Sequence, residues 1–115
     1  MAHMIIAGKA CQAISGQTLE VRSPVDGLVF EHIPRGDAKD IDAAVSAARA
    51  ALSGEWGKLS ATERGRLMMK LSFLVTEHAE ELALLEARDT GKPMTTARND
   101  MVVLSRYFEF YGRSE

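Results

Sequence analysis

The first third of the chain alternates short runs of β-forming residues with turn dipeptides. Such runs flank Ser15-Gly16 and Asp26-Gly27, and each dipeptide is typical of a tight turn between strands. We therefore predict three or four short strands with hairpin-like connections at these dipeptides. Residues 5–34 form the expected β-hairpin region.

After Pro34 the spacing of apolar residues changes to that of a helix. Asp37 is a candidate N-cap, and Gly54 is a candidate helix end. Between them, apolar side chains recur at helical spacing, at Ile41, Ala44, Val45, Ala48 and Leu52. This segment is predicted to be one amphipathic helix with a small-sided apolar face.

A second helical stretch begins at Ser60, which forms a capping-box pattern with Glu63. Its apolar positions predict a helix that kinks or restarts near His78 and then continues to Asp89. The second part is expected to turn three side chains inward, those of Ala79, Leu82 and Leu85.

Gly91 and Pro93 mark the boundary to the last helix. Glycine suits the left-handed residue after a helix, and proline suits the first turn of the next one. The segment 94–112 carries one apolar stripe, at Ala97, Met101, Leu104, Phe108 and Tyr111. The predicted fold class is therefore α+β and mostly α, with short N-terminal β-hairpin strands followed by three to four helices in residues 37–115.

Composition places the chain among ordinary globular proteins and excludes several partners. Hydrophobic residues make up 46%, charged residues 26%, and the formal net charge is −2. The basic residues are scattered among acids, so no basic stripe exists to bind nucleic acid. No apolar run approaches the roughly 20 residues that span a bilayer, so no membrane partner is expected. The single Cys11 excludes an internal disulfide, which fits a cytoplasmic location.

No residue set carries an obvious catalytic or cofactor-binding function. Cys11 lies on an expected strand without a nearby base, and buried structural cysteine is the commoner state. The histidines His3, His32 and His78 lack metal-ligand spacing. Gly91-Lys92 does not complete a phosphate-binding loop, because Glu86 replaces the early glycine and Pro93 the hydroxyl residue.

Four motifs nevertheless occur in a recognisable order: the SP-DG turn, the D-DAAV-AAR-A helix, the W-LS-ER-R-L entry and LE-RDTGKP. They lie in the stretches SGQTLEVRSPVDGLVFEHIPRGDAKDIDAAVSAARAAL and EWGKLSATERGRLMMKLSFLVTEHAEELALLEARDTGKP, and YFEFYG follows. From Ile5 onward, nearly the whole chain resembles the amino-terminal segment of the NAD(P)-dependent aldehyde dehydrogenase superfamily.

The resemblance implies a much longer enzyme that oxidises aldehydes to carboxylic acids with NAD or NADP. In that family a cysteine attacks the carbonyl, hydride passes to the nicotinamide, and a glutamate activates water. Those residues lie downstream of this segment, and Cys11 does not fall at the nucleophile position. Residues 1–115 are therefore expected to be a single partial domain, a piece of the cofactor-binding domain without its Rossmann-like sheet. It should be catalytically inactive and bind no cofactor alone, whether it is a natural truncation or a shortened form.

The resemblance also implies a monovalent cation site with three mapped positions. Many family members hold such a cation through main-chain oxygens before the SP turn and through the acid of DTGKP, which here are Val21, Arg22 and Asp89. Hard cations favour oxygen ligands. A further ligand belongs to the missing part, so weak or absent binding is expected. In the alternative interpretation, Asp89 binds loop amides or a neighbouring base.

Two functional hypotheses remain open. In the first, the chain is the β-hairpin and helical flank of an aldehyde dehydrogenase; its apolar helix faces would have lost their partner sheet, which favours self-association. In the second, it is a free-standing helical interaction or oligomerisation module. The aldehyde substrate and the choice between NAD and NADP depend on residues outside this segment.

Overall fold

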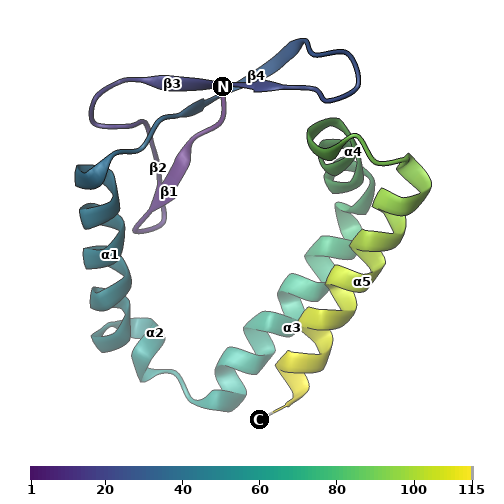
Figure 1. Cartoon of the computed structure of the whole chain (residues 1–115). Helices are drawn as coiled ribbons and strands as arrows, with labels where there is room; N and C mark the ends of the chain where they lie inside the picture. The colour runs from purple at the N-terminus through teal and green to yellow at the C-terminus, as the bar shows by residue number, and fades with distance from the viewer. Residues whose placement is uncertain (115) are drawn as a thin grey trace. The chain divides into compact units, whose positions relative to one another are not determined.

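The computed structural model describes residues 1–114, and within them short strands precede the helices (Figure 1). β1 (Met4–Ile6) pairs with β2 (Lys9–Cys11), and β3 (Thr18–Arg22) pairs with β4 (Val29–Pro34), both antiparallel. The remaining secondary-structure elements of the described chain are helices. The expected α+β, mostly α fold class is confirmed.

The first hairpin turn is not at the predicted dipeptide. β1 and β2 are joined by Ala7 and Gly8, whose φ angles of 53° and 75° are both positive, as in two-residue turns that match strand twist. Ser15-Gly16 lies in a turn closed by the Gly16 amide and the Ala13 carbonyl, 2.9 Å apart, between strands that do not pair. The prediction of a hairpin connection at Ser15-Gly16 is wrong, because alanine gave no signal for the left-handed turn that the backbone adopts.

The second hairpin turn is confirmed at Asp26-Gly27. The Asp26 carboxylate accepts a hydrogen bond from the Leu28 amide at 2.9 Å, and Gly27 has φ 73°. The Ser23 amide donates to the Leu28 carbonyl at 2.9 Å and closes the loop. The β3–β4 register shifts between Val21 and Arg22, so a bulge interrupts the ladder at the residues predicted to bind a cation.

α1 (Ala38–Ser53) starts with the expected Asp37 N-cap and ends at Gly54. Its first turn carries Asp40, which is 3% exposed. The Asp40 carboxylate accepts from the Asp37 amide at 2.9 Å and from the Ile14 amide at 3.0 Å. These two backbone donors hold the pKa of Asp40 below its usual range. One buried carboxylate therefore caps the helix and ties it to the β2–β3 connection.

The described residues form two compact units, Met1–Lys58 and the segment from Leu59 onward. α1 and the short α2 (Glu55–Lys58) belong to the unit that holds the strands. The boundary between these units lies just before the second long helix. On α1 the large members of the predicted apolar stripe are exposed in this chain, at Ile41, Val45 and Leu52.

The second unit contains α3 (Ala61–Glu77), α4 (Ala79–Thr90) and α5 (Met94–Arg113). The Ser60 and Glu63 capping box and the restart at His78 are confirmed. Gly91 adopts the left-handed conformation, with φ 76°. Pro93 is the N-cap of α5, one position before the first turn in which it was expected.

α3 and α5 run antiparallel and side by side (Figure 1), and mostly small residues fill the space between them. A Cβ added to Gly112 would lie 2.9 Å from the Gly65 carbonyl oxygen. Backbones this close leave no room for large side chains. The core of the unit is correspondingly small-sided, with Ala83, Ala97 and Met101 buried.

The predicted inward position of Leu85 on α4 is therefore wrong, because Leu85 is exposed. Tyr111, predicted to lie on the apolar stripe of the last helix, is exposed as well. At these places the buried face of each helix is rotated toward smaller residues, Ala83 and Gly112. Close helix packing buries small side chains and leaves the large ones on the flanks. No helix in the described part of the chain is long and apolar enough to cross a membrane.

Candidate functional site

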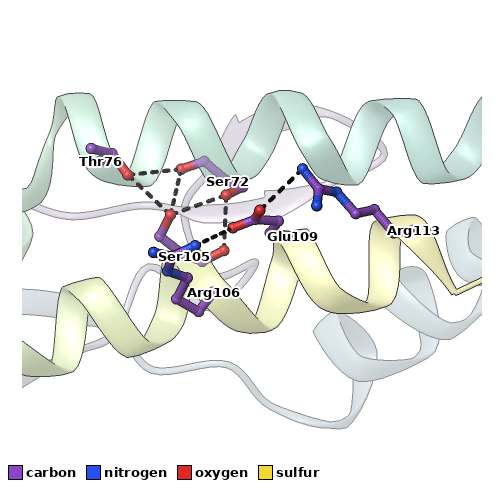
Figure 2. A network of polar contacts seen from close by, with 6 residues as sticks. All are labelled: Ser72, Thr76, Ser105, Arg106, Glu109 and Arg113. Atoms are coloured by element: carbon purple, nitrogen blue, oxygen red, sulfur yellow. Dashed lines mark hydrogen bonds and ion pairs between the residues drawn. The ribbon is translucent and has the colours of Figure 1, made fainter.

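A buried hydroxyl network joins α3 to α5 (Figure 2). The Ser72 hydroxyl donates to the Ser105 carbonyl at 2.8 Å, and the Ser105 hydroxyl donates to the Ser72 carbonyl at 3.1 Å. The Ser105 hydroxyl also lies 3.0 Å from the Thr76 hydroxyl. These reciprocal bonds satisfy each buried polar group and set the register of the two helices.

The sequence contains a pattern that predicts this close contact between α3 and α5, and the motifs described above do not include it. Small residues recur two helical turns apart on each helix, Gly65 and Ser72 on α3 and Ser105 and Gly112 on α5. In antiparallel helices such pairs meet, glycine opposite glycine and serine opposite serine. The pattern marks a close helix contact and supplies no reactive group.

A groove of about 460 Å³ runs beside this network. Its polar wall is the Glu109 carboxylate, which accepts from Arg106 at 3.1 Å and pairs with Arg113 at 3.1 Å (Figure 2). Its apolar wall contains Phe73 and Val102. Both arginine side chains are largely exposed, so these are surface ion pairs and contribute little to stability.

The other flank of α5 carries a continuous apolar surface, which we call the outer face of α5. It consists of Val102, Val103, Tyr107, Phe110 and Tyr111. These side chains are between 43% and 64% exposed, and they line a hollow of about 440 Å³ together with Arg106. The Phe110 and Tyr111 rings pack edge to face with centroids 5.1 Å apart. This surface is suited to binding an apolar partner.

The corner between α4 and α5 is held by Lys92. Its ammonium group lies 2.6 Å from the Asp100 carboxylate and 2.9 Å from the Glu86 carboxylate. The bond to Asp100, and then the one to Glu86, raise the pKa of Lys92 above its ordinary value. Lys92 is therefore a structural bridge between the helices, which agrees with the rejection of a phosphate-binding loop.

The predicted cation ligands fall in separate units. Val21 and Arg22 lie on β3, whereas Asp89 lies in the last turn of α4. The Arg22 guanidinium bonds Glu20 and the Gly27 carbonyl of its own hairpin. Because a guanidinium has only nitrogen donors, only the main-chain carbonyl of Arg22 could supply a ligand oxygen.

Neither alternative partner of Asp89, a loop amide or a neighbouring base, is bound to it within residues 1–114. Its side chain makes no hydrogen bond or ion pair with the rest of residues 1–114, and the adjacent Lys92 is bound to other acids. A carboxylate at the negative end of a helix dipole attracts cations. The cation site stays a prediction.

Of the candidate nucleophile and bases, Cys11 and His3 lie at the first hairpin, and His78 lies in the second unit. Cys11 is half-buried on β2, His3 bonds Gln12 at 2.6 Å, and His78 faces Glu81 at 3.4 Å. No group of three or more metal-ligating side chains occurs among residues 1–114. The described residues instead form an apolar surface on α5 and polar contacts that hold the helices together.

A family model described as "Aldehyde dehydrogenase family" matches residues 11–114. The match covers most of the chain, including both strands of the second hairpin and all five helices.

The chain belongs to the aldehyde dehydrogenase family.

Three relatives show how this family segment relates to longer proteins. It is 40% identical to "Aldehyde dehydrogenase family 2 member B4, mitochondrial" of Arabidopsis thaliana, over 96% of this chain and 21% of that protein. It is 41% identical to "Cytosolic 10-formyltetrahydrofolate dehydrogenase" of Homo sapiens, over 92% of this chain and 12% of that protein. The crystal structure of an NAD-dependent aldehyde dehydrogenase from Sinorhizobium meliloti matches with a TM-score of 0.93 and 36% identity, over 96% of this chain and 22% of that one.

The aldehyde dehydrogenase segment thus spans about a fifth or less of the curated relatives it matches, and it corresponds to the amino-terminal portion of the aldehyde dehydrogenase family. The resemblance predicted from the RDTGKP and DAAV motifs is confirmed at the level of the family. The cation site implied by the same resemblance stays a prediction, with Val21 and Arg22 on β3 and Asp89 on α4.

Proposed function

We propose that this chain serves as the amino-terminal part of an enzyme that oxidises aldehydes to carboxylic acids with NAD or NADP. The family match over residues 11–114 carries the proposal. The Sinorhizobium meliloti relative is named as NAD-dependent, which supports a nicotinamide cofactor for the complete enzyme. The single-cysteine composition further supports a cytoplasmic location, although relatives carry both cytosolic and mitochondrial names.

In this proposal the chain contributes no reacting group of its own. Cys11 does not fall at the family's nucleophile position. The role of the segment is to cover and support the remaining enzyme with its helices. By itself it is expected to bind no nicotinamide cofactor and to turn over no aldehyde.

The experiment compares the chain alone with the chain joined to the rest of a relative. Residues 1–115 replace the matching segment of the Sinorhizobium meliloti enzyme, and NADH formation is followed with a panel of aldehydes. We expect activity from the chimera and none from the purified chain. A soluble, folded chimera without activity would overturn the proposal, as would measurable aldehyde oxidation by the chain alone.

A second candidate function rests on the exposed apolar side chains of the helices. A helical interaction or oligomerisation module would also expose large apolar side chains for binding. Such side chains occur here at Phe73, Tyr107 and Phe110. The reading frame beyond Glu115 discriminates between the two functions. Codons that continue into a cofactor domain with a catalytic cysteine favour the enzyme, and a native stop codon with a stable monomer favours the module.

We further propose that the isolated chain self-associates through these apolar helix faces. Burial of exposed apolar area is the driving force, at about 25 cal/mol per Å². Sedimentation velocity across micromolar concentrations tests this, and a concentration-dependent shift to larger species is expected. A single monomeric species throughout the range would contradict it.

The monovalent cation proposal is tested separately on the chain. Thermal unfolding is measured in potassium chloride and in choline chloride at equal ionic strength, for the wild type and for Asp89→Asn. Because a further ligand lies outside this segment, we expect little or no potassium-specific shift. A large shift that Asp89→Asn abolishes would show that the chain alone completes the site.

A further inference from the structure

The loop between β3 and β4 contains a pair of residues that is reactive by its chemistry. Asp26 and Gly27 form the one Asp-Gly pair in the sequence, and both residues are exposed. In such a pair the main-chain nitrogen of the glycine can attack the Cγ atom of the aspartate, because glycine has no Cβ to obstruct the approach. Apart from the two chain neighbours, no atom of the described residues lies within 4 Å of the place that a Cβ on Gly27 would take.

The reaction is an internal loss of water followed by hydrolysis. The Gly27 nitrogen forms a bond to the Asp26 Cγ, while the amide proton and the carboxyl hydroxyl group leave together as water. The product is a cyclic imide, the succinimide. Water then opens this ring, and attack at the main-chain carbonyl carbon gives isoaspartate, whereas attack at Cγ restores aspartate. The mass of the chain is unchanged, and water is the only other reactant.

The folded loop holds both reacting groups in other contacts. The Gly27 amide donates a hydrogen bond to the Ser23 carbonyl at 2.8 Å. The Asp26 carboxylate accepts a hydrogen bond from the Leu28 amide at 2.9 Å, as in an Asx turn. Ring closure removes the amide proton of the first bond and converts the carboxylate of the second into a neutral carbonyl. It therefore breaks the first contact and weakens the second.

The carbonyl group of Gly27 is bound as well. The Arg22 guanidinium on β3 donates to it at 3.2 Å. Gly27 is thus held at both its amide and its carbonyl, with a φ angle of 73°. Rotation of the main chain at this residue, which would turn its nitrogen toward the Asp26 side chain, is restrained from both sides.

We propose that Asp26-Gly27 is a site of spontaneous isoaspartate formation that the folded β3–β4 loop keeps unreactive, with Arg22 as a positioning residue of this protection. The modification accumulates while the loop is open through local unfolding. Isoaspartate carries an additional carbon atom in the main chain, so the modified loop does not regain its contacts. Each modified chain is thus a lasting record of loop opening. The inference is independent of the proposed enzyme function.

Incubation of the purified 115-residue chain at neutral pH tests the proposal. The chain is held either in native buffer or unfolded in guanidinium chloride, and the peptide that contains Asp26 is followed by liquid chromatography and electron-transfer fragmentation, which distinguish the two isomers. We expect isoaspartate to form at least about tenfold more slowly in the native chain, because hydrogen bonds must open first. Equal rates in both conditions would overturn the proposal, and so would an unfolded chain that forms no isoaspartate. Asp26→Glu should form none in either condition, since a larger ring closes less readily.

Two arginine variants test the protection in the folded chain. Arg22→Met removes the donor to the Gly27 carbonyl and should accelerate the native reaction by about two- to tenfold. Arg35→Met is the matched control, because it removes the same type of exposed side chain just after β4, at the other end of the hairpin from the loop. It should react as the wild type does. In guanidinium chloride all three proteins should react equally. An unchanged native rate in Arg22→Met, or the same increase in Arg35→Met, would refute the role of Arg22.

Discussion

Gly112 provides the sharpest test of how the second unit is packed. In a Gly112→Ala protein the new Cβ would lie 2.9 Å from the Gly65 carbonyl oxygen, 3.2 Å from the Met68 Cβ and 3.3 Å from the Met69 amide nitrogen. Two of these three atoms belong to the backbone and cannot rotate away. α3 and α5 must therefore move apart by several tenths of an ångström.

The magnitude follows from two opposing effects. Overpacking in a close contact costs about 1–3 kcal/mol. Replacing glycine by alanine within a helix stabilises it by up to about 1 kcal/mol, and by less here because Gly112 lies in the last turn of α5. We expect a net loss of about 1–2 kcal/mol. For a unit of this size the melting temperature should fall by roughly 8–16 °C.

The assay is thermal and urea unfolding followed by far-ultraviolet circular dichroism at several protein concentrations. Asn99→Ala is the control, because Asn99 is exposed on the same helix and the change alters only helix propensity. That variant should be as stable as the wild type or slightly more stable. If Gly112→Ala proves as stable as Asn99→Ala, the close approach of α3 and α5 is not the constraint that we describe.

Three further changes test the polar contacts. Ser105→Ala removes the hydroxyl shared by Ser72 and Thr76 and should lower the free energy of unfolding by about 1–3 kcal/mol, measured in urea; an unchanged midpoint would contradict the network. Asp40→Asn should lower stability at neutral pH. Because the folded pKa of Asp40 is depressed, its contribution is present above about pH 4 and lost as pH falls through the lower folded value; acid titrations of wild type and variant should therefore converge, and a constant gap would refute this. Lys92→Met should destabilise the α4–α5 corner in low salt, and the difference from wild type should shrink in 1 M sodium chloride.

Local chemistry explains why the helix boundaries were predictable from sequence. Asp37 and Ser60 cap their helices with side chains that reach only the next turn, and Gly91 ends α4 through its own backbone freedom. Such contacts span a few residues, so the residues themselves determine them. The family was likewise readable, because its motifs are contiguous stretches of sequence.

Tertiary structure decided which faces are buried. The hydrophobic period placed Leu85 and Tyr111 on inner stripes, yet the close contact between helices selected Ala83, Ser105 and Gly112 and turned larger side chains outward. The β1–β2 pairing across Ala7-Gly8 was also not predictable from the sequence, because alanine has no preference for the left-handed conformation that this turn needs. Packing depends on the distance between backbones, which arises only when separate elements meet; caps and turns depend on neighbours along the chain.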